Sequence, residues 1–204
     1  MSIARAEGET ARLGLIGPNA ITQMAAALSD AWGAPLRREV FEDAGLAPYL
    51  FAPPTHMIPE EEVARLHQAV VDRLGEANAA EVSREAGRRT GDYLLANRIP
   101  AFVQGALKIL PRPLAARILV AAIARHAWTF SGSGKFSYEF APHLRLRIIR
   151  SPICKGLCTE APACAYFAAT FERVFGEMLG PSLSVTETEC AATGAAACVF
   201  EARW

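Results

Sequence analysis

The sequence predicts an α+β fold, in which a helical N-terminal part is followed by a four-stranded antiparallel sheet with one helix between its two hairpins. Apolar residues recur at helical spacing in successive stretches up to Trp128. From residue 131 the pattern changes to alternation, which is typical of strands. The last residues form two short runs rich in Val, Thr and Phe around Thr193 and Gly194. These three observations favour helices first and a sheet second.

The first helices are delimited by their own start and stop residues. The first is expected to end at Gly33, and a shorter one that follows Pro35 should stop at Gly45. Pro59 precedes a strong helix with three glutamates in its first turn, where the helix dipole favours acids. A further helix is predicted over residues 77–97.

Two helical stretches then follow, over residues 101–110 and 114–128, and a Pro-Arg-Pro segment separates them. The second stretch is apolar on almost all sides. Because such a helix is usually buried, we expect residues 114–128 to form the central core helix.

The second half reads as strand, strand, helix, strand and strand. Residues 136–140 and 144–148 alternate around a turn at Pro142 and predict a hairpin. A last helix is expected over residues 164–179, before a hairpin that ends the chain. Together these elements give the four strands of the predicted sheet.

Composition excludes some classes of protein. Of the 204 residues, 51% are hydrophobic, which is ample for one core. Lys plus Arg and Asp plus Glu each number 21, so the formal net charge is zero. This balance argues against a nucleic-acid-binding surface, which would need a basic excess.

The chain is expected to be a single domain of residues 16–204 after a flexible tail of residues 1–15, with a helical part at 16–130 and a sheet and zinc-site part at 131–204. The N-terminal segment is polar and charged, without the apolar stretch of a signal peptide. No apolar run reaches membrane-spanning length. We therefore expect a cytoplasmic protein without a transmembrane segment.

The last forty residues contain a candidate metal site. If Gly194 is left-handed in a three-residue loop, Ala191 faces Ala195, and Cys190 and Cys198 share one face of the hairpin. Two thiolates placed this way can share a zinc ion. Glu187 would point the other way in a regular strand, so it joins them only through a bulge or a strand end.

Two other interpretations of the five cysteines stay open at this point. Cysteine is among the most often buried residue types, so these side chains could be small core hydrophobes. Cys190 and Cys198 could instead form a disulfide across the hairpin, although nothing in the sequence indicates an oxidising compartment.

Two glycine-rich segments resemble nucleotide loops only superficially. Residues 13–19 lack a preceding strand and a third glycine in register. Residues 131–136, SerGlySerGlyLysPhe, have Phe136 where a phosphate loop carries its magnesium-binding hydroxyl. No nucleophile elbow or redox-cofactor motif is visible either.

From about Ala124 onward, and most clearly from Cys164, the chain resembles the 4-vinyl reductase domain family. In that family a cysteine precedes a helix, and a Glu-x2-Cys-x7-Cys hairpin follows. Members such as the sensor domains of phenol-responsive transcription activators bind zinc through these four residues. The resemblance implies the same ligands here, namely Cys164, Glu187, Cys190 and Cys198. Cys154 and Cys158 fall outside the pattern and are interpreted as loop thiols or spare ligands.

Residues 91–100 and 126–134 are similar to the branch of this family that serves bacteriochlorophyll biosynthesis. That branch was named 4-vinyl reductase and is also regarded as a carrier of magnesium tetrapyrroles. The resemblance implies a structural zinc ion, a Mg-tetrapyrrole as ligand, possible contacts with pigment-synthesis enzymes and a homodimer. Because three thiolates and a carboxylate would close the zinc site, we expect the metal to be structural rather than catalytic.

A tetrapyrrole would need aromatic walls, an axial histidine and basic groups at its rim. The candidates near the change from helix to sheet are His126, Trp128, Phe130, Tyr93, Phe102 and Arg98. Aromatic residues that enter a sheet are more often core, and a histidine at a helix end is more often a dipole partner.

Three functions remain. The first is a non-catalytic carrier or accessory protein that binds divinyl protochlorophyllide or a related Mg-porphyrin. The second is an 8-vinyl (formerly 4-vinyl) reductase of protochlorophyllide. The third is a module that senses a small ligand, as in the wider family.

Overall fold

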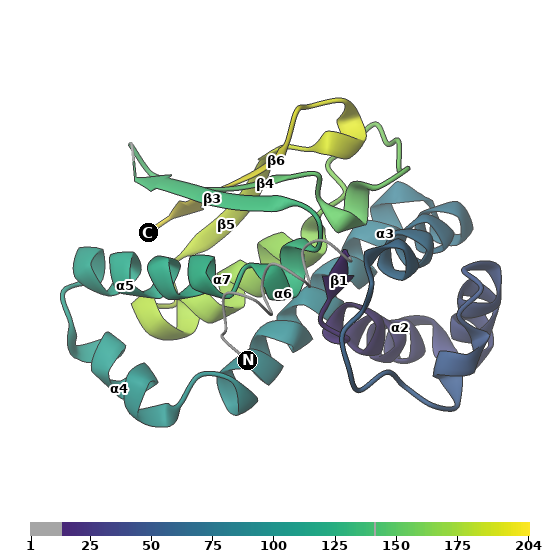
Figure 1. Ribbon diagram of the computed structural model, residues 1–204, viewed down its shortest axis with the longest axis horizontal. Helices are drawn as coiled ribbons and strands as arrows, with labels where there is room; N and C mark the ends of the chain where they lie inside the picture. The colour runs from purple at the N-terminus through teal and green to yellow at the C-terminus, as the bar shows by residue number, and fades with distance from the viewer. Residues whose placement is uncertain (1–13, 141) are drawn as a thin grey trace.

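The computed structural model describes residues 14–140 and 142–204, and its α+β architecture confirms the predicted fold class (Figure 1). The first thirteen residues of the expected tail lie outside the described residues. Leu15, the last residue of that tail, is already in a strand: β1 (Leu15–Ile16) pairs with β2 (Ile58–Pro59). No helix in the described residues combines the length and apolar character needed to cross a bilayer.

Two long helices, α2 (Asn19–Asp43) and α3 (Glu60–Asn97), form most of the N-terminal half. Each is bent at one glycine with positive φ, Gly33 at 84° and Gly75 at 73°. A side chain is strained in this conformation, so glycine is the residue suited to both bends. The predicted breaks between helices are therefore kinks within two longer elements.

Three shorter helices lead to the sheet: α4 (Ala101–Ile109), α5 (Arg112–Arg125) and α6 (Trp128–Ser131). The expectation that α5 is the central core helix is wrong. It buries only Ala115, Ala116, Leu119 and Val120. The opposite face carries Leu114 and Ile118, which are 47% and 44% exposed.

The sheet has the strand order β3-β4-β6-β5, and all its neighbours are antiparallel. Its strands are β3 (Lys135–Phe140), β4 (Leu144–Ile149), β5 (Ser184–Glu189) and β6 (Cys198–Arg203). Helix α7 (Ala165–Leu179) connects the two hairpins and lies against one face of the sheet, while no helix covers the other face in Figure 1. The sheet is thus covered by helices on one side only.

Helix α7 is the true core helix. Its aromatic side chains Phe167, Phe171 and Phe175 are at most 5% exposed. They meet the central strand β6 through Phe200, whose ring centroid lies 5.7 Å from that of Phe171. Burial of large aromatic side chains contributes about 1.5–3 kcal/mol each, so this cluster stabilises the union of helix and sheet.

The contact between α3 and α7 is unusually close. A Cβ at Gly87 would lie 2.1 Å from the Tyr166 carbonyl oxygen, so only glycine fits there. The Thr170 hydroxyl donates to the Gly87 carbonyl oxygen at 3.0 Å across the same contact. Because both helices carry small residues where they cross, their backbones approach within hydrogen-bonding reach.

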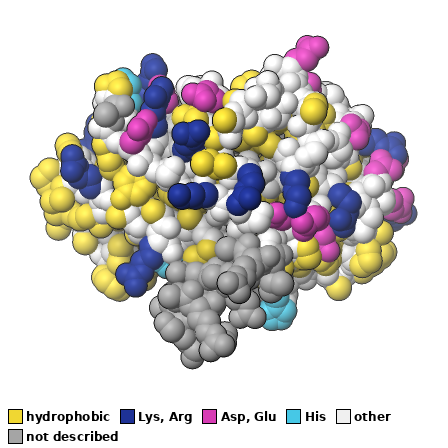
Figure 2. All heavy atoms as spheres, turned by 45° about the horizontal axis from the view of Figure 1, so that its top comes forward, with side chains coloured by type: hydrophobic (Ala, Val, Ile, Leu, Met, Phe, Trp, Pro, Cys, Tyr) yellow, Lys and Arg dark blue, Asp and Glu magenta, His cyan; other side chains and the backbone are white. Residues whose placement is uncertain are grey.

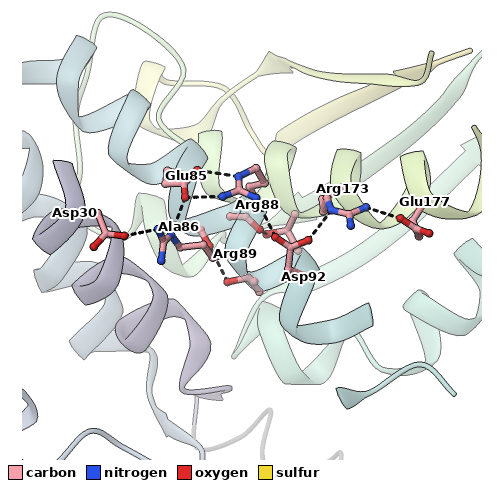
Figure 3. A network of polar contacts seen from close by, with 11 residues as sticks. Asp30, Glu85, Ala86, Arg88, Arg89, Asp92, Arg173 and Glu177 are labelled. Atoms are coloured by element: carbon pink, nitrogen blue, oxygen red, sulfur yellow. Dashed lines mark hydrogen bonds and ion pairs between the residues drawn. The ribbon is translucent and has the colours of Figure 1, made fainter. Parts of the chain in front are cut away.

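Ion pairs border this contact (Figure 3). Arg89 links Asp30 of α2 to Glu85, and Arg173 of α7 joins Asp92 of α3 to Glu177. These side chains are largely exposed, so each pair contributes no more than about 1 kcal/mol. The network fixes the relative positions of three helices more than it adds stability.

Candidate metal centre

Four buried cysteines from four separate segments meet at one end of the sheet. Cys154 ends a short 3-10 turn after β4, and Cys164 precedes the first residue of α7. Cys190 follows β5, and Cys198 opens β6. All four are free thiols, and none is more than 8% exposed. Residues up to 44 positions apart in sequence therefore share one site.

The sulfur atoms have the spacing of a four-coordinate site. Cys154 Sγ lies 3.2 Å from Cys164, 3.6 Å from Cys190 and 3.5 Å from Cys198, and all four sulfurs lie within 4.8 Å of one another. A tetrahedral zinc ion with Zn–S bonds of about 2.3 Å separates its sulfurs by about 3.8 Å. The residues present thus fit a zinc ion with little rearrangement.

Backbone N–H groups point at the sulfurs. Ala163 N lies 3.3 Å from Cys190 Sγ, and Ala191 N lies 3.4 Å from Cys198 Sγ. Donors in this position stabilise thiolates and orient them toward a metal. The neighbouring thiols, Cys154 first, lower the pKa of Cys190 well below that of an ordinary thiol. Burial raises the pKa of Cys164 instead. Four buried thiolates can coexist only if a cation balances their charge.

Glu187 stands beside the cluster. Its Oε2 accepts a hydrogen bond from the Cys164 N–H at 2.8 Å, at the start of α7. Its Oε1 is buried and has no hydrogen-bond partner among the described residues. Burial, followed by the negative charge of Cys190, raises the pKa of Glu187 to about 9. The carboxyl group therefore holds the backbone of one ligand residue and lies in the immediate surroundings of the sulfurs.

The hairpin geometry agrees in part with the sequence analysis. Gly194 is left-handed, with φ of 94°, as predicted. The pairing has an irregularity between Glu187 and Glu189, where a bulge was required. The expected pairing of Ala191 with Ala195 is wrong, because Ala195 N bonds to the Cys190 carbonyl oxygen at 3.1 Å. A 3-10 turn over Ala191–Thr193 makes the loop longer than three residues.

Cys154 is the ligand candidate that the sequence analysis left outside the set. Cys158, the other cysteine of that loop, is exposed. The signal that separates the two is the apolar Pro-Ile-Cys segment, in which Ile153 is 1% exposed. Cys154 thus has the surroundings of a buried residue, whereas Cys158 does not.

A second missed residue is Glu60, which the sequence places in an ordinary first helical turn. Its side chain is only 3% exposed. It accepts hydrogen bonds from Ser133 N and Ser133 Oγ, both at 2.7 Å, and from Lys155 Nζ at 3.0 Å. The glycine-rich turn that resembles a phosphate loop therefore binds an internal carboxylate. Lys155 ties this clasp to the residue next to Cys154.

The residues considered for a tetrapyrrole do not form one cluster. The Arg98 guanidinium lies 5.9 Å from the Tyr93 ring centroid. Phe130 packs against Phe136 and Phe171 at 5.4 and 5.9 Å, so it is part of the core. These three residues thus divide between the end of α3 and the interior.

The other three candidates lie at or near the surface. Phe102 of α4 is 78% exposed. His126 is exposed at the end of α5, with Nδ1 2.9 Å from the Ala122 carbonyl oxygen. Trp128 is half-buried, and its Nε1 has no partner among the described residues. A hollow of about 330 Å³ near α4, α5 and α7 is lined by none of the six.

Two curated proteins align with almost the whole chain. The bacteriochlorophyll synthase 23 kDa chain of Cereibacter sphaeroides is 43% identical over 91% of this chain and 89% of its own length. The protein of the same name from Rhodobacter capsulatus is 41% identical over 91% of this chain and 85% of its own. The chain belongs to the family of these 23 kDa chains.

The family model of the 4-vinyl reductase domain matches residues 144–203. This confirms the resemblance to that domain family. The matched segment includes all four buried cysteines and Glu187, so the candidate metal centre lies entirely within it. The residues considered for a tetrapyrrole lie outside it.

Solved structures of H-NOX proteins share the fold. One, described as probing heme distortion in the H-NOX family, has a TM-score of 0.57 at 15% identity and covers 93% of this chain and 95% of its own. An unliganded Fe(II) H-NOX protein from K. algicida has a TM-score of 0.59 at 10% identity, over 92% of this chain and 96% of its own. At this level of identity the likeness concerns the fold alone.

Proposed function

We propose that the protein is a non-catalytic, zinc-stabilised binding protein that holds a magnesium tetrapyrrole during bacteriochlorophyll biosynthesis. The pathway assignment is carried by the near-full-length similarity to the two bacteriochlorophyll synthase 23 kDa chains. We place its work in the cytoplasm, where the five free cysteines would stay reduced. Pigment-synthesis enzymes are its proposed partners.

The metal centre supports a holding role. We assign Cys154, Cys164, Cys190 and Cys198 as the ligands, because their four sulfurs lie within 4.8 Å of one another. Four soft thiolates in a buried, tetrahedral arrangement favour zinc over harder cations. Such a site has no open position for a substrate, and zinc itself carries no electrons. When bound, the ion would join the loop after β4, the start of α7 and the terminal hairpin.

His126 is the proposed axial ligand of the pigment. Its Nδ1 must carry the proton that is donated to the Ala122 carbonyl oxygen, because a carbonyl can only accept. In the neutral ring this leaves the lone pair on Nε2, which is the atom that would coordinate magnesium. Trp128 offers an aromatic surface two residues away. Arg98, Tyr93 and Phe102 complete the proposed contacts, and Phe130 supports them from the core.

The test is titration of the zinc-loaded protein with Mg-protoporphyrin, followed by absorption spectroscopy and native mass spectrometry. We expect a shifted Soret band and one pigment per chain, and His126→Gln should weaken binding at least about tenfold. His56→Gln is the matched control, because His56 is also exposed. The same mass spectra report whether the expected homodimer forms.

Two outcomes contradict the proposal. Equal pigment affinity of His126→Gln and the wild type would remove His126 as the ligand, and no Soret shift at all would remove the holding role. Conversion of divinyl to monovinyl pigment by the pure protein with NADPH would show a reductase instead.

A further inference from the structure

Helices α4 and α5 form a hairpin, defined here as residues 101–125, whose outward face is apolar. Phe102 and Ile109 of α4 are 78% and 85% exposed, and Leu114 and Ile118 of α5 are 47% and 44% exposed. Soluble proteins seldom leave large apolar side chains together in water, so a face of this kind marks a contact surface.

The exposed residues follow the helical repeat. On α4, Phe102, Gly105, Ala106 and Ile109 are exposed at the spacing i, i+3, i+4 and i+7. On α5 the corresponding set is Leu114, Ile118, Ala121, Ala122 and Arg125. Each set therefore forms one stripe along its helix. The opposite faces of both helices contact α7, so both stripes point away from the core.

The charge of the hairpin has one sign. It contains Lys108, Arg112, Arg117 and Arg125 and no acidic residue, although the whole chain has 21 of each sign. Lys108 pairs with Glu177 of α7. The three arginines make no ion pair within the part of the chain that the structure describes. In Figure 2 hydrophobic and basic side chains gather at the left, the side where Figure 1 places α4 and α5.

We propose that this hairpin docks the protein on the surface of an anionic lipid bilayer. Exposed Phe, Ile and Leu side chains would enter the boundary between headgroups and acyl chains, and the arginines would meet the lipid phosphates. The helices would lie in the interface and would not span it, since α4 and α5 have 9 and 14 residues.

A second copy of the chain fits this face less well. A two-fold contact places the same patch on both sides of the interface, so it would bring the arginines of one copy against those of the other. The hairpin offers no acidic residue to balance them. Anionic lipid supplies the opposite charge and an apolar layer together, which is why charge complementarity favours the membrane.

The experiment is co-flotation of the full chain, without pigment, with phosphatidylglycerol/phosphatidylcholine vesicles and with pure phosphatidylcholine vesicles. We expect binding to the anionic vesicles that weakens as salt increases. Arg112→Gln/Arg117→Gln should lower the partition coefficient about 25-fold, or about fivefold for each charge removed. Ile109→Ser/Ile118→Ser should weaken binding at every salt concentration.

Matched controls separate the face from a general surface effect. Phe51→Ser removes an apolar side chain that is 87% exposed on another part of the molecule, and Arg84→Gln removes an exposed charge on α3. Both should bind vesicles like the wild type. The isoleucine variants should keep their urea midpoints, because they alter exposed positions.

Three results would overturn the proposal. The first is no binding to anionic vesicles. The second is equal binding of the hairpin variants and the controls. The third is a lipid-free dimer that Ile109→Ser/Ile118→Ser converts to a monomer, which would make the face an interface between copies. Since no pigment is present, these results do not depend on the proposed function.

Discussion

Cys154 and Cys158 lie one helical turn apart in sequence but have opposite surroundings. Cys154 Sγ is within 3.6 Å of three other sulfurs, whereas Cys158 is exposed. A thiol at the centre of a cluster can serve a metal only if its loop is held in place. The Lys155 contact to Glu60, one residue away, provides that restraint.

Serine substitutions test the ligand set. Cys154→Ser should lose most of the bound zinc, because it removes one of four thiolates, while Cys158→Ser should retain about one ion per chain. Metal content is measured by native mass spectrometry. Glu187→Gln should also retain the ion if the carboxyl group acts only on the Cys164 N–H. Full zinc content in Cys154→Ser together with loss in Glu187→Gln would instead favour the ligands implied by the family resemblance.

His67 predicts a dependence of stability on pH. Its side chain is 2% exposed, and burial lowers its pKa from 6.5 to about 4. The folded state then binds fewer protons than the unfolded state between these values. Stability is therefore fully present above pH 6.5 and is lost as pH falls toward 4, by up to about 3 kcal/mol.

The measurement is urea unfolding of the wild type and His67→Phe from pH 7 to pH 4. Thiolate protonation affects both proteins, so the difference between them isolates the histidine. The wild type should lose more stability than the variant across this range. Parallel curves would show that His67 does not titrate as its burial implies.

At the scale of elements, the crossing of α3 and α7 positions the start of α7 and, with it, Cys164. Gly87 permits this crossing, because a Cβ there would lie 2.1 Å from the Tyr166 carbonyl oxygen. The Thr90 and Tyr166 hydroxyl groups, 2.8 Å apart, add a buried hydrogen bond beside it. The metal centre therefore depends on a contact between backbones as well as on its own ligands.

Gly87→Ala should destabilise the fold by about 3 kcal/mol, since the two helices must separate to admit a methyl group. Gly105→Ala is the matched control. It also lies within a helix, but nothing stands within 4 Å of its Cβ position. Because alanine favours helix, Gly105→Ala should stabilise the protein by about 0.5–1 kcal/mol. Chemical denaturation measures both, and similar midpoints for the two variants would contradict the close crossing.

The sequence was most informative about elements with local signals. Alternation predicted the hairpin of β3 and β4, and Gly194 predicted the left-handed turn. Cys154 escaped because a loop, which has no periodicity, carries it to the cluster. Glu60 escaped because glutamates in a first helical turn are usually solvated. The exposed face of α5 escaped because apolar composition does not distinguish a helix buried in protein from one that faces another partner.

For the whole molecule, the centre joins segments that the rest of the fold holds only at their ends. Structural zinc contributes to folding free energy directly. At a free concentration a thousand times its Kd, a bound ion stabilises the folded state by about 4 kcal/mol. In a domain of this size each kcal/mol corresponds to about 2–4 °C in Tm.

Removal of the metal by a chelator should therefore lower Tm by about 10 °C, and added zinc should restore it. Differential scanning calorimetry measures both steps. The Cys154→Ser variant is the control, because its Tm should be low from the start and should not respond to the chelator. An unchanged Tm after verified metal loss would show that the cluster is stable as four thiols.

The clasp around Glu60 gives the metal centre a distant reporter. Cys154 and Lys155 are adjacent, so a loop that relaxes when the ion leaves must also draw the ammonium group away from the carboxylate. The remaining partner of that carboxylate is Ser133, whose amide donates to it at 2.7 Å. We therefore expect the NMR signal of the Ser133 amide, in the turn before β3, to read out metal occupancy without any probe on a sulfur atom.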